Sequence, residues 1–248
     1  MNKLYIVANW KMNPEHSKQA IDLAKEIQTT IEPREDVRVV LCPPFVFVPQ
    51  LLASEHIAVG AQDCFWEDQG AFTGEISPTM LVSLGCEYVI VGHSERKNHL
   101  GETFEMINKK VKAALTAGLT PVLCIGEKKR GDNKEELREQ MTRVLQDISA
   151  EQVKKVILAY EPEWAISTNE NAIEATREDC AQSIAYIREV IEKMFGKDVA
   201  DLSRVLYGGS TNSGNIKSFI DAGAAGALVG SASLNAKEFI QLVKNTAQ

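Results

Sequence analysis

Short apolar runs rich in β-branched residues alternate with longer segments of helical periodicity, and this alternation occurs eight times along the 248-residue chain. Most of the runs lack polar interruptions, as do parallel strands that are buried on both faces. The pattern therefore predicts an α/β fold with a parallel sheet. The eight predicted strands are Leu4–Ala8, Val37–Cys42, Ile57–Gln62, Tyr88–Gly92, Thr120–Ile125, Val156–Tyr160, Arg204–Tyr207 and Ala227–Gly230.

The repeats continue without a composition break or a Pro/Gly-rich linker, which predicts a single domain over residues 1–248. Eight such units suit a closed (β/α)8 barrel with a parallel eight-stranded sheet. The alternative is an open, doubly wound sheet. Open sheets usually carry a Gly-rich nucleotide turn after the first strand, whereas the first strand here leads into Asn9-Trp10-Lys11-Met12-Asn13. The closed barrel is the preferred interpretation.

Apolar residues at helical spacing predict helices that cover the sheet. The segment from Arg177 to Phe195 is the clearest case, because its apolar stripe consists of Cys180, Ile184, Ile187, Ile191 and Met194. Residues typical of helix ends agree with this reading. Pro14 is expected in a first helical turn, and Gly118 and Gly196 are expected at left-handed helix ends.

Charge and cysteine content exclude several classes of protein. A formal net charge of −7 disfavours nucleic acid or an anionic membrane as the main partner. The five cysteines are odd in number and contain no C-x-x-C pair, so neither a disulfide framework nor a zinc site is indicated. No window approaches the roughly 18 apolar residues of a membrane span. We expect a cytoplasmic protein without a membrane partner.

Residues capable of chemistry follow five of the predicted strands. In a (β/α)8 barrel the carboxyl ends of all strands meet at one face, where the active site lies. We therefore expect convergence of Asn9 and Lys11 after the first strand, His93 and Glu95 after the fourth, Glu161 after the sixth, Gly208-Gly209-Ser210 after the seventh, and Gly230-Ser231 after the eighth.

Each of these residues also has a plainer interpretation. Lys11 could be a solvated loop residue, and His93 could be a turn histidine with satisfied hydrogen bonds. The glycines after the last two strands could simply form tight turns. Glu161 is more unusual, because Pro162 restricts its backbone and holds a carboxylate at a strand end.

The combination favours catalysis over these separate explanations. Gly-rich turns that expose N–H groups and open onto helices form a phosphate cradle, and this is its recurrent place in barrels. Beside it, Glu161 can take a proton next to a carbonyl, a neutral His93 can polarise that carbonyl, and Lys11 can stabilise negative charge. We predict proton transfer in a small phosphorylated sugar. No cofactor motif or metal-ligand spacing competes, so neither a cofactor nor a metal is expected.

The connection from Pro162 to Thr176 is long for a barrel and carries Trp164-Ala165-Ile166. Apolar residues on a long loop beside a catalytic carboxylate predict a lid that closes over the substrate and excludes water. The alternative is an ordered surface loop whose Trp packs on the barrel.

Four segments resemble the signature blocks of the triosephosphate isomerase family, in order and over essentially the whole chain. The resemblance implies a TIM barrel that interconverts dihydroxyacetone phosphate and D-glyceraldehyde 3-phosphate through an enediolate, without cofactor or metal. The family mechanism, which is carried over here, pairs a Glu base with a neutral His. The four segments are Asn9 to Asn13, Val91 to Arg96, Ala159 to Ile166 and Tyr207 to Ser210.

The same resemblance implies a role for each matching residue. Glu161 would be the base, His93 the electrophile, and Lys11 and Asn9 would contact the substrate. Glu95 would support Lys11. The backbone around Ser167, Ser210, Gly230 and Ser231 would hold the phosphate.

The block from Gly60 to Pro78 resembles the loop through which members of this family form homodimers. It implies that Thr73 reaches the active site of the partner subunit, near Lys11 and His93. From the residues alone, the block could equally be a self-packed surface loop.

Two departures from the family pattern affect the phosphate end and the lid. Ser167-Thr168-Asn169 stands where Gly-Thr-Gly is usual, and Gly230-Ser231 where two glycines are usual. A Ser supplies the same N–H group but restricts the backbone. Whether these residues shift the preference toward a four-carbon ketose phosphate, such as an erythrulose phosphate, stays open. A non-catalytic barrel that only binds sugar phosphates is the third alternative.

Overall fold

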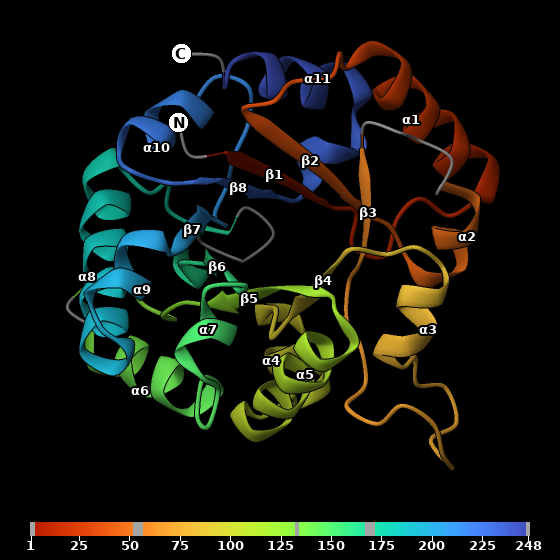
Figure 1. The fold of residues 1–248 in the computed structure, drawn as a ribbon. Helices are drawn as coiled ribbons and strands as arrows, with labels where there is room; N and C mark the ends of the chain where they lie inside the picture. Colours follow the sequence, from red (N-terminus) through yellow and green to blue (C-terminus); the bar gives the residue numbers. More distant parts are fainter. Residues whose placement is uncertain (1–2, 52–56, 132–133, 167–171, 247–248) are drawn as a thin grey trace.

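The eight strands close into a parallel barrel in the order β1 to β8, with β8 paired to β1 (Figure 1). The computed structural model describes residues 3–51, 57–131, 134–166 and 172–246. The predicted (β/α)8 barrel is confirmed, and the open sheet is excluded. The strands are β1 Leu4–Asn9, β2 Val37–Cys42, β3 Ala58–Ala61, β4 Tyr88–Val91, β5 Thr120–Ile125, β6 Ile157–Tyr160, β7 Arg204–Tyr207 and β8 Gly226–Val229.

Each predicted strand agrees with an observed one to within one residue at either end. The start of β8 differs from the prediction, because the strand begins at Gly226, one residue before the predicted apolar run. Only glycine fits at this position. Its φ is +129°, and a Cβ there would lie 1.9 Å from the carbonyl oxygen of Tyr5 on the neighbouring strand.

Helices pack around the outside of the barrel (Figure 1). None of those in the described residues is long and apolar enough to cross a membrane. The helices are α1 Ser17–Thr30, α2 Val48–Leu51, α3 Pro78–Ser83, α4 Ser94–Leu100, α5 Phe104–Ala117, α6 Lys134–Val144, α7 Ala150–Val153, α8 Arg177–Phe195, α9 Lys197–Leu202, α10 Ile216–Asp221 and α11 Ala236–Lys244, with 3-10 turns η1 Phe45–Phe47, η2 Glu163–Ala165 and η3 Ser231–Leu234.

The observed helix ends can be compared with the ends that were predicted from individual proline and glycine residues. Helix α8 has the predicted bounds, and the side chain of Thr176 caps its N-terminus. Gly118 ends α5 in the left-handed conformation, as predicted, whereas Gly196 has a positive φ of 92° but an extended ψ of 164°. The expectation for Pro14 is wrong, since α1 begins at Ser17. Pro14 instead follows a cis peptide bond in the loop before that helix.

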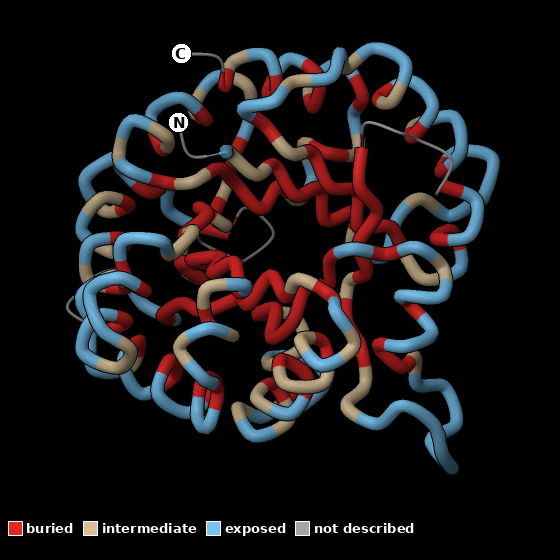
Figure 2. The backbone as a smooth tube through the Cα atoms, in the orientation of Figure 1, coloured by how far each residue is buried: buried red, intermediate tan, exposed pale blue. Residues whose placement is uncertain are grey.

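The core has two layers, which explains why the strands are apolar at nearly every position. Successive side chains of a strand point to opposite faces. Val7 therefore packs inside the barrel, while Ile6 and Ala8 pack between the sheet and the helices. Figure 2 shows the buried backbone concentrated in the strands and on the inner sides of the helices. This arrangement leaves the residues that follow each strand to form a rim at the barrel end.

Candidate active site

A cavity of about 230 Å³ lies at the carboxyl ends of the strands. Its lining combines residues that follow five different strands, as the sequence predicted. Of the predicted catalytic and substrate-binding residues, only Ser167 lies outside the described chain, and the others line the cavity: Asn9, Lys11, His93, Glu161, Ser210, Gly230 and Ser231. The two predicted supporting residues do not line it, since Glu95 reaches it through Lys11 and Thr73 lies on an exposed loop. The predicted convergence is thus observed for the residues of one chain.

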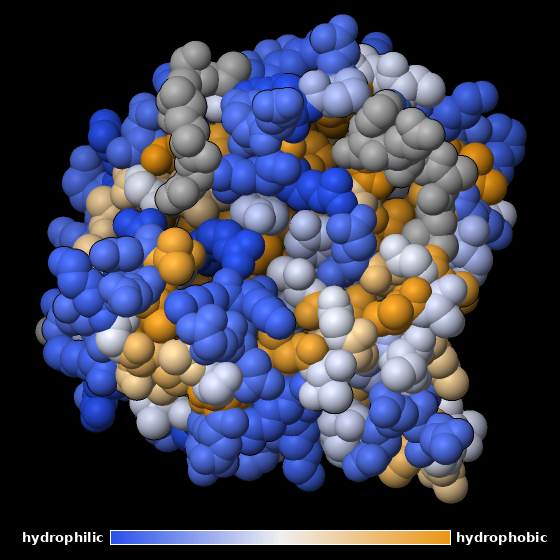
Figure 3. Space-filling model, in the orientation of Figure 1, coloured by the Kyte–Doolittle hydropathy of each residue, from blue (hydrophilic) through white to orange (hydrophobic). Residues whose placement is uncertain are grey.

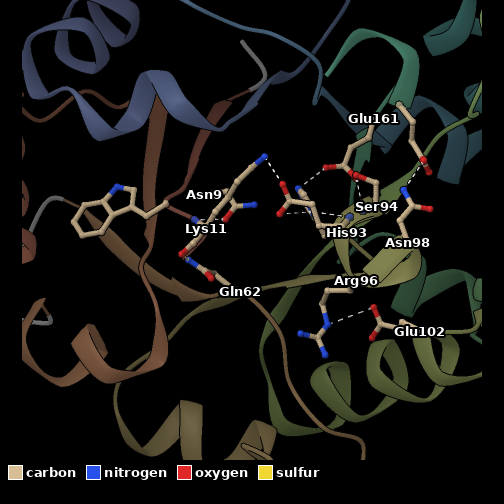
Figure 4. A network of polar contacts seen from close by, with 12 residues as sticks. Asn9, Lys11, Gln62, His93, Ser94, Arg96, Asn98, Glu102 and Glu161 are labelled. Carbon is tan, nitrogen blue, oxygen red and sulfur yellow. Dashed lines mark hydrogen bonds and ion pairs between the residues drawn. The ribbon is translucent and has the colours of Figure 1, made fainter. Parts of the chain in front are cut away.

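Glu161 and His93 are in direct contact inside this cavity (Figure 4). Oε1 of Glu161 lies 3.0 Å from Nε2 of His93, and Oε2 accepts a hydrogen bond of 3.1 Å from the N–H of Ser94. The Glu161 side chain is almost fully buried. The next strand limits its position, since a Cβ on Gly208 would lie 2.8 Å from Cγ of Glu161. The carboxylate therefore has a defined place with two donors.

The orientation of the His93 ring follows from its place at the start of α4. Nδ1 accepts a hydrogen bond of 3.2 Å from the N–H of Glu95 and so caps the helix. A nitrogen that accepts a hydrogen bond carries no proton, which assigns the proton of a neutral ring to Nε2. That N–H faces Glu161. These hydrogen bonds are satisfied by a neutral imidazole, the form that polarises a carbonyl without carrying charge.

The two side chains shift each other's proton affinity. Burial lowers the pKa of His93, but the charge of Glu161 and the hydrogen bond to it outweigh burial, so the pKa of His93 is raised. Burial raises the pKa of Glu161, but His93, Lys97 and the Ser94 N–H reverse this, so the pKa of Glu161 is lowered. Glu161 is therefore ionised and able to accept a proton. The raised pKa of His93 depends on the nearby carboxylate.

Lys11 is held in an unusual backbone conformation, with a φ of +52°. Two neighbours stabilise it. Oδ1 of Asn9 accepts a 3.0 Å hydrogen bond from the Lys11 N–H, and Nε2 of Gln62 donates to the Lys11 carbonyl at 2.8 Å. Nε2 of Gln62 also donates to the carbonyl of Cys42, which ties β2 to the same loop. Sequence reasoning missed Gln62, because nothing in the pattern indicates which carbonyls its amide can reach.

The ammonium of Lys11 pairs with the carboxylate of Glu95, as the resemblance implied for a supporting residue. Nζ of Lys11 lies 2.5 Å from Oε1 of Glu95, and the two side chains are 20% and 37% exposed. At this exposure the pair contributes little to stability. Its effect is to hold the ammonium at the edge of the cavity that also contains His93 (Figure 4).

The turns after β7 and β8 form a further part of the cavity wall, next to Lys11 and Glu161. In the described part of the chain, the N–H groups of Gly230 and Ser231 donate to no carbonyl or side chain. Ser210 differs, because its N–H and its Oγ both donate to the carbonyl of Ala165, at 3.2 and 2.8 Å. In this conformation Ser210 thus binds η2. Its N–H becomes available to a ligand only after that bond breaks.

The turn that follows Glu161 is anchored by a carboxylate that sequence reasoning did not identify. Oε1 of Glu127 accepts hydrogen bonds from the Tyr160 hydroxyl at 2.7 Å and from Nε1 of Trp164 at 2.8 Å. The guanidinium of Arg130 lies over the Trp164 ring, 5.4 Å from its centroid. Trp164 is therefore held by specific polar contacts, and not only by packing on the barrel.

A buried ionic cluster lies beneath the loop that carries His93. Nζ of Lys110 contacts both carboxylate oxygens of Asp63 at 2.8 Å and also bonds Glu102, while Arg96 reaches Asp63 at 2.8 Å (Figure 4 shows Arg96 and Glu102). Burial raises the pKa of Asp63 to about 6, although Lys110 opposes this. The cluster connects the segment after β3 with α4 and α5.

The described residues contain no group of three or more His, Cys, Asp or Glu side chains placed to hold a metal ion. The chemistry available in this cavity is acid–base and electrostatic: a carboxylate, an imidazole with its proton on Nε2, an ammonium, and N–H groups that face the same space.

Comparisons with known proteins agree with this arrangement. The family model of triosephosphate isomerase matches residues 4–246. The chain is 42% identical to the triosephosphate isomerase of Dictyoglomus thermophilum over 99% of this chain and 100% of that protein. It is 43% identical to the triosephosphate isomerase of Clostridium botulinum, over 98% of this chain and 99% of that protein. The chain belongs to the triosephosphate isomerase family.

Proposed function

We propose that Glu161, His93 and Lys11 catalyse the reaction that membership of the family assigns to this protein, the interconversion of dihydroxyacetone phosphate and D-glyceraldehyde 3-phosphate. The protein is then an aldose–ketose isomerase of glycolysis and gluconeogenesis. The observation that carries the proposal is the contact of 3.0 Å between Glu161 and His93 in one cavity with Lys11.

The reaction needs a base for a C–H proton and a donor for the carbonyl oxygen. Glu161 removes the proton from the carbon that bears the hydroxyl, and the electron pair moves to the carbonyl oxygen as an enediolate forms. The Nε2 proton of His93 is transferred to that oxygen, and the imidazole then takes the proton of the neighbouring hydroxyl. Glu161 returns its proton to the other carbon. Each group ends in its starting form.

The remaining residues stabilise the enediolate or bind the phosphate of the substrate. Lys11 places positive charge beside the developing enediolate, and Asn9 fixes the backbone of Lys11. The N–H groups at Gly230 and Ser231 are suited to the phosphate, joined by Ser210 once it leaves Ala165. We assign closure over the substrate to the segment from Pro162 to Thr176, whose residues 167–171, including Ser167 and Asn169, lie outside the described chain.

A coupled assay with D-glyceraldehyde 3-phosphate tests the assignment of the base. We expect rapid conversion by the wild-type protein and a loss of several orders of magnitude in the Glu161→Gln variant. Glu174→Gln is a matched control, since it changes an exposed acid of the same loop. Comparable activity in wild type and Glu161→Gln would contradict the assignment. Turnover of a four-carbon ketose phosphate, measured alongside, distinguishes the family substrate from the longer sugar.

We also propose a homodimer. The segment between β3 and α3 projects away from the barrel (Figure 1), and residues 67–75, with Thr73 among them, are exposed. Met12 is 94% exposed and Val46 is 72% exposed, so both apolar side chains are available for contact with a partner. A partner subunit would cover them and receive Thr73. Sedimentation should give twice the chain mass of 27.3 kDa, and a monomer at micromolar concentration would remove the role of Thr73.

A cytoplasmic location and a single domain over residues 1–248 complete the proposal. All five cysteines are free and buried, as suits a reducing compartment. Burial raises the pKa of the Cys86 thiol to about 11, which keeps it protonated and unreactive. The pairing of β8 with β1 supports one domain, because the first and last strands complete the same barrel.

A further inference from the structure

A second cavity, of about 550 Å³, lies at the end of the barrel opposite the active site. Its lining includes Arg204, the first residue of β7, and residues just before β1 and β6. Gly208, which lines the active-site cavity, follows Arg204 by four residues, or about 13 Å of extended strand. The two cavities are therefore separate. We call the second one the basic pocket, defined by Lys3, Tyr5, Lys154, Arg188, Asp201 and Arg204.

The charge of the basic pocket contrasts with the rest of the molecule. Its lining carries the positive side chains of two lysines and two arginines against one carboxylate, that of Asp201, although the whole chain has a formal net charge of −7. On the face shown in Figure 3, strongly hydrophilic residues lie beside exposed apolar ones. A local positive field in an acidic protein selects anions against the general repulsion of the surface.

The cations of the basic pocket are largely without counter-ions. Six of the nine arginines form ion pairs with carboxylates; of the three that form none with a described acid, two are Arg188 and Arg204. Lys3 likewise has no ion pair with a described acid, whereas Lys154 pairs with Glu151 at 2.5 Å. Three positive charges in one cavity therefore form no ion pair with an acid in the described residues.

Arg204 is fixed in place by groups that do not neutralise it. Its guanidinium donates to the Tyr5 hydroxyl at 3.1 Å and to the carbonyl of Lys154, and it lies over the Tyr5 ring, 5.5 Å from the centroid. Arg188 is similarly directed by a hydrogen bond to the carbonyl of Gly223. Neutral acceptors of this kind orient a guanidinium and leave its charge available to an oxyanion.

We propose that the basic pocket binds a small polyanion that carries at least two phosphate groups. Lys3, Arg188 and Arg204 come from three different segments of the chain, and three positive charges without an ion pair favour a ligand that carries several negative charges. The volume of about 550 Å³ accommodates a ligand larger than one phosphate. Binding is electrostatic and weakens with added salt.

Inorganic pyrophosphate is the probe that tests this site. Amide NMR spectra of the ¹⁵N-labelled protein, recorded during a titration, report the location as well as the affinity. We expect shifts at Lys3, Arg204 and Ala225, which are separate from any shifts at Gly230 and Ser231 in the active site. Shifts confined to the active site, or none at about 10 mM probe, would overturn the proposal. Because the two sets of amides are distinct, failure of this site leaves the isomerase assignment untouched.

Charge-matched variants separate a specific site from general attraction. Arg188→Glu and Lys25→Glu change the net charge equally; Arg188 is half-buried in the basic pocket, whereas Lys25 is exposed on α1 outside it. Binding at the basic pocket should weaken by about tenfold or more in Arg188→Glu and change little in Lys25→Glu. Lys3→Glu provides a second variant, should Arg188→Glu lower the melting temperature. Equal weakening by the pocket and control variants would show a general charge effect and overturn the proposal.

Orthophosphate tests the requirement for two phosphate groups. We expect it to bind the basic pocket at least about tenfold more weakly than pyrophosphate, because it carries less negative charge and fills less of the cavity. Equal affinities for the two anions would contradict the proposed ligand class.

Discussion

Oε1 of Glu161 lies 3.0 Å from Nε2 of His93, so the proposed base and the proposed electrophile bind each other in this structure. A substrate that uses both groups must replace this contact with its own. When Glu161 turns to the substrate, His93 loses the carboxylate that raises its pKa most, while burial and the charge of Lys11, which lower the pKa, and Glu95, which raises it, remain. Substrate binding thus favours the neutral imidazole that the reaction uses.

This relationship predicts the titration of His93. In Glu161→Gln the carboxylate that stabilises the imidazolium is gone, so the pKa of His93 should fall below its wild-type value. NMR spectra of the imidazole as a function of pH measure both values. Glu95→Gln should cause a smaller decrease, since its carboxylate is half-exposed and lies 3.6 Å from Nδ1. An unchanged or higher pKa in Glu161→Gln would contradict the contact as the cause.

Gly208→Ala should lower turnover without unfolding the protein. The new Cβ would lie 2.8 Å from Cγ of Glu161, so that side chain must move. A displacement on the order of 1 Å costs about 100-fold in rate when it affects a reacting group. The backbone of Gly208 lies outside the left-handed region, and the contact of 3.1 Å between the new Cβ and the Tyr160 carbonyl oxygen requires only a small shift, so we expect the fold to be kept. Steady-state kinetics beside thermal melts make the test, and full activity would show that Glu161 has room to adapt.

Gln62→Met should impair the site through Lys11. Methionine has nearly the same shape but cannot donate to the carbonyls of Lys11 and Cys42, so the strained backbone of Lys11 loses a support. We expect kcat/KM to fall by about tenfold or more. Gln28→Met is the matched control, because Gln28 also donates to a carbonyl, that of Leu51, away from the cavity. Equal effects of the two substitutions would indicate a loss of stability instead.

Asp63 should make stability depend on pH between about 4 and 6. Its pKa is about 6 in the folded protein against 3.8 for a free side chain, so in this window the folded state keeps a proton that the unfolded state loses. Its contribution to the free energy of unfolding therefore falls as pH rises, by about 3 kcal/mol across the window.

Urea unfolding at several pH values, in wild type and Asp63→Asn, isolates this contribution. The free energy of unfolding of wild type minus that of the variant should decrease as pH rises from 4 to 6. A difference that stays flat or increases would show that Asp63 keeps an ordinary pKa in the cluster.

Much of the fold and the site could be predicted from the sequence, for identifiable reasons. Strands buried on both faces give continuous apolar runs, and α8 shows one apolar stripe between a capping Thr176 and Gly196. The reactive residues follow the strands, so the closure of the barrel alone brings Lys11, His93 and Glu161 together.

The contacts that position these residues could not be predicted in the same way. Ser94 acts through its backbone N–H, which no side-chain pattern reveals. Gln62 and Glu127 act on groups from other strands, and Lys110 is a charged residue buried in a helix. Each of these contacts depends on distances between side chains that only the complete fold determines. The prediction that Pro14 lies in a first helical turn was wrong for a local reason, because the loop before α1 extends beyond this residue.

The pairing of β8 with β1 has a consequence for synthesis on the ribosome. Lys11 is synthesised long before Ser231, yet both line one cavity. Until β8 emerges, β1 exposes an unpaired edge, and the growing chain has no enclosed site for a substrate. The site can therefore form only after β8 has emerged, and we expect a chain truncated before Gly226 to be inactive and prone to aggregate.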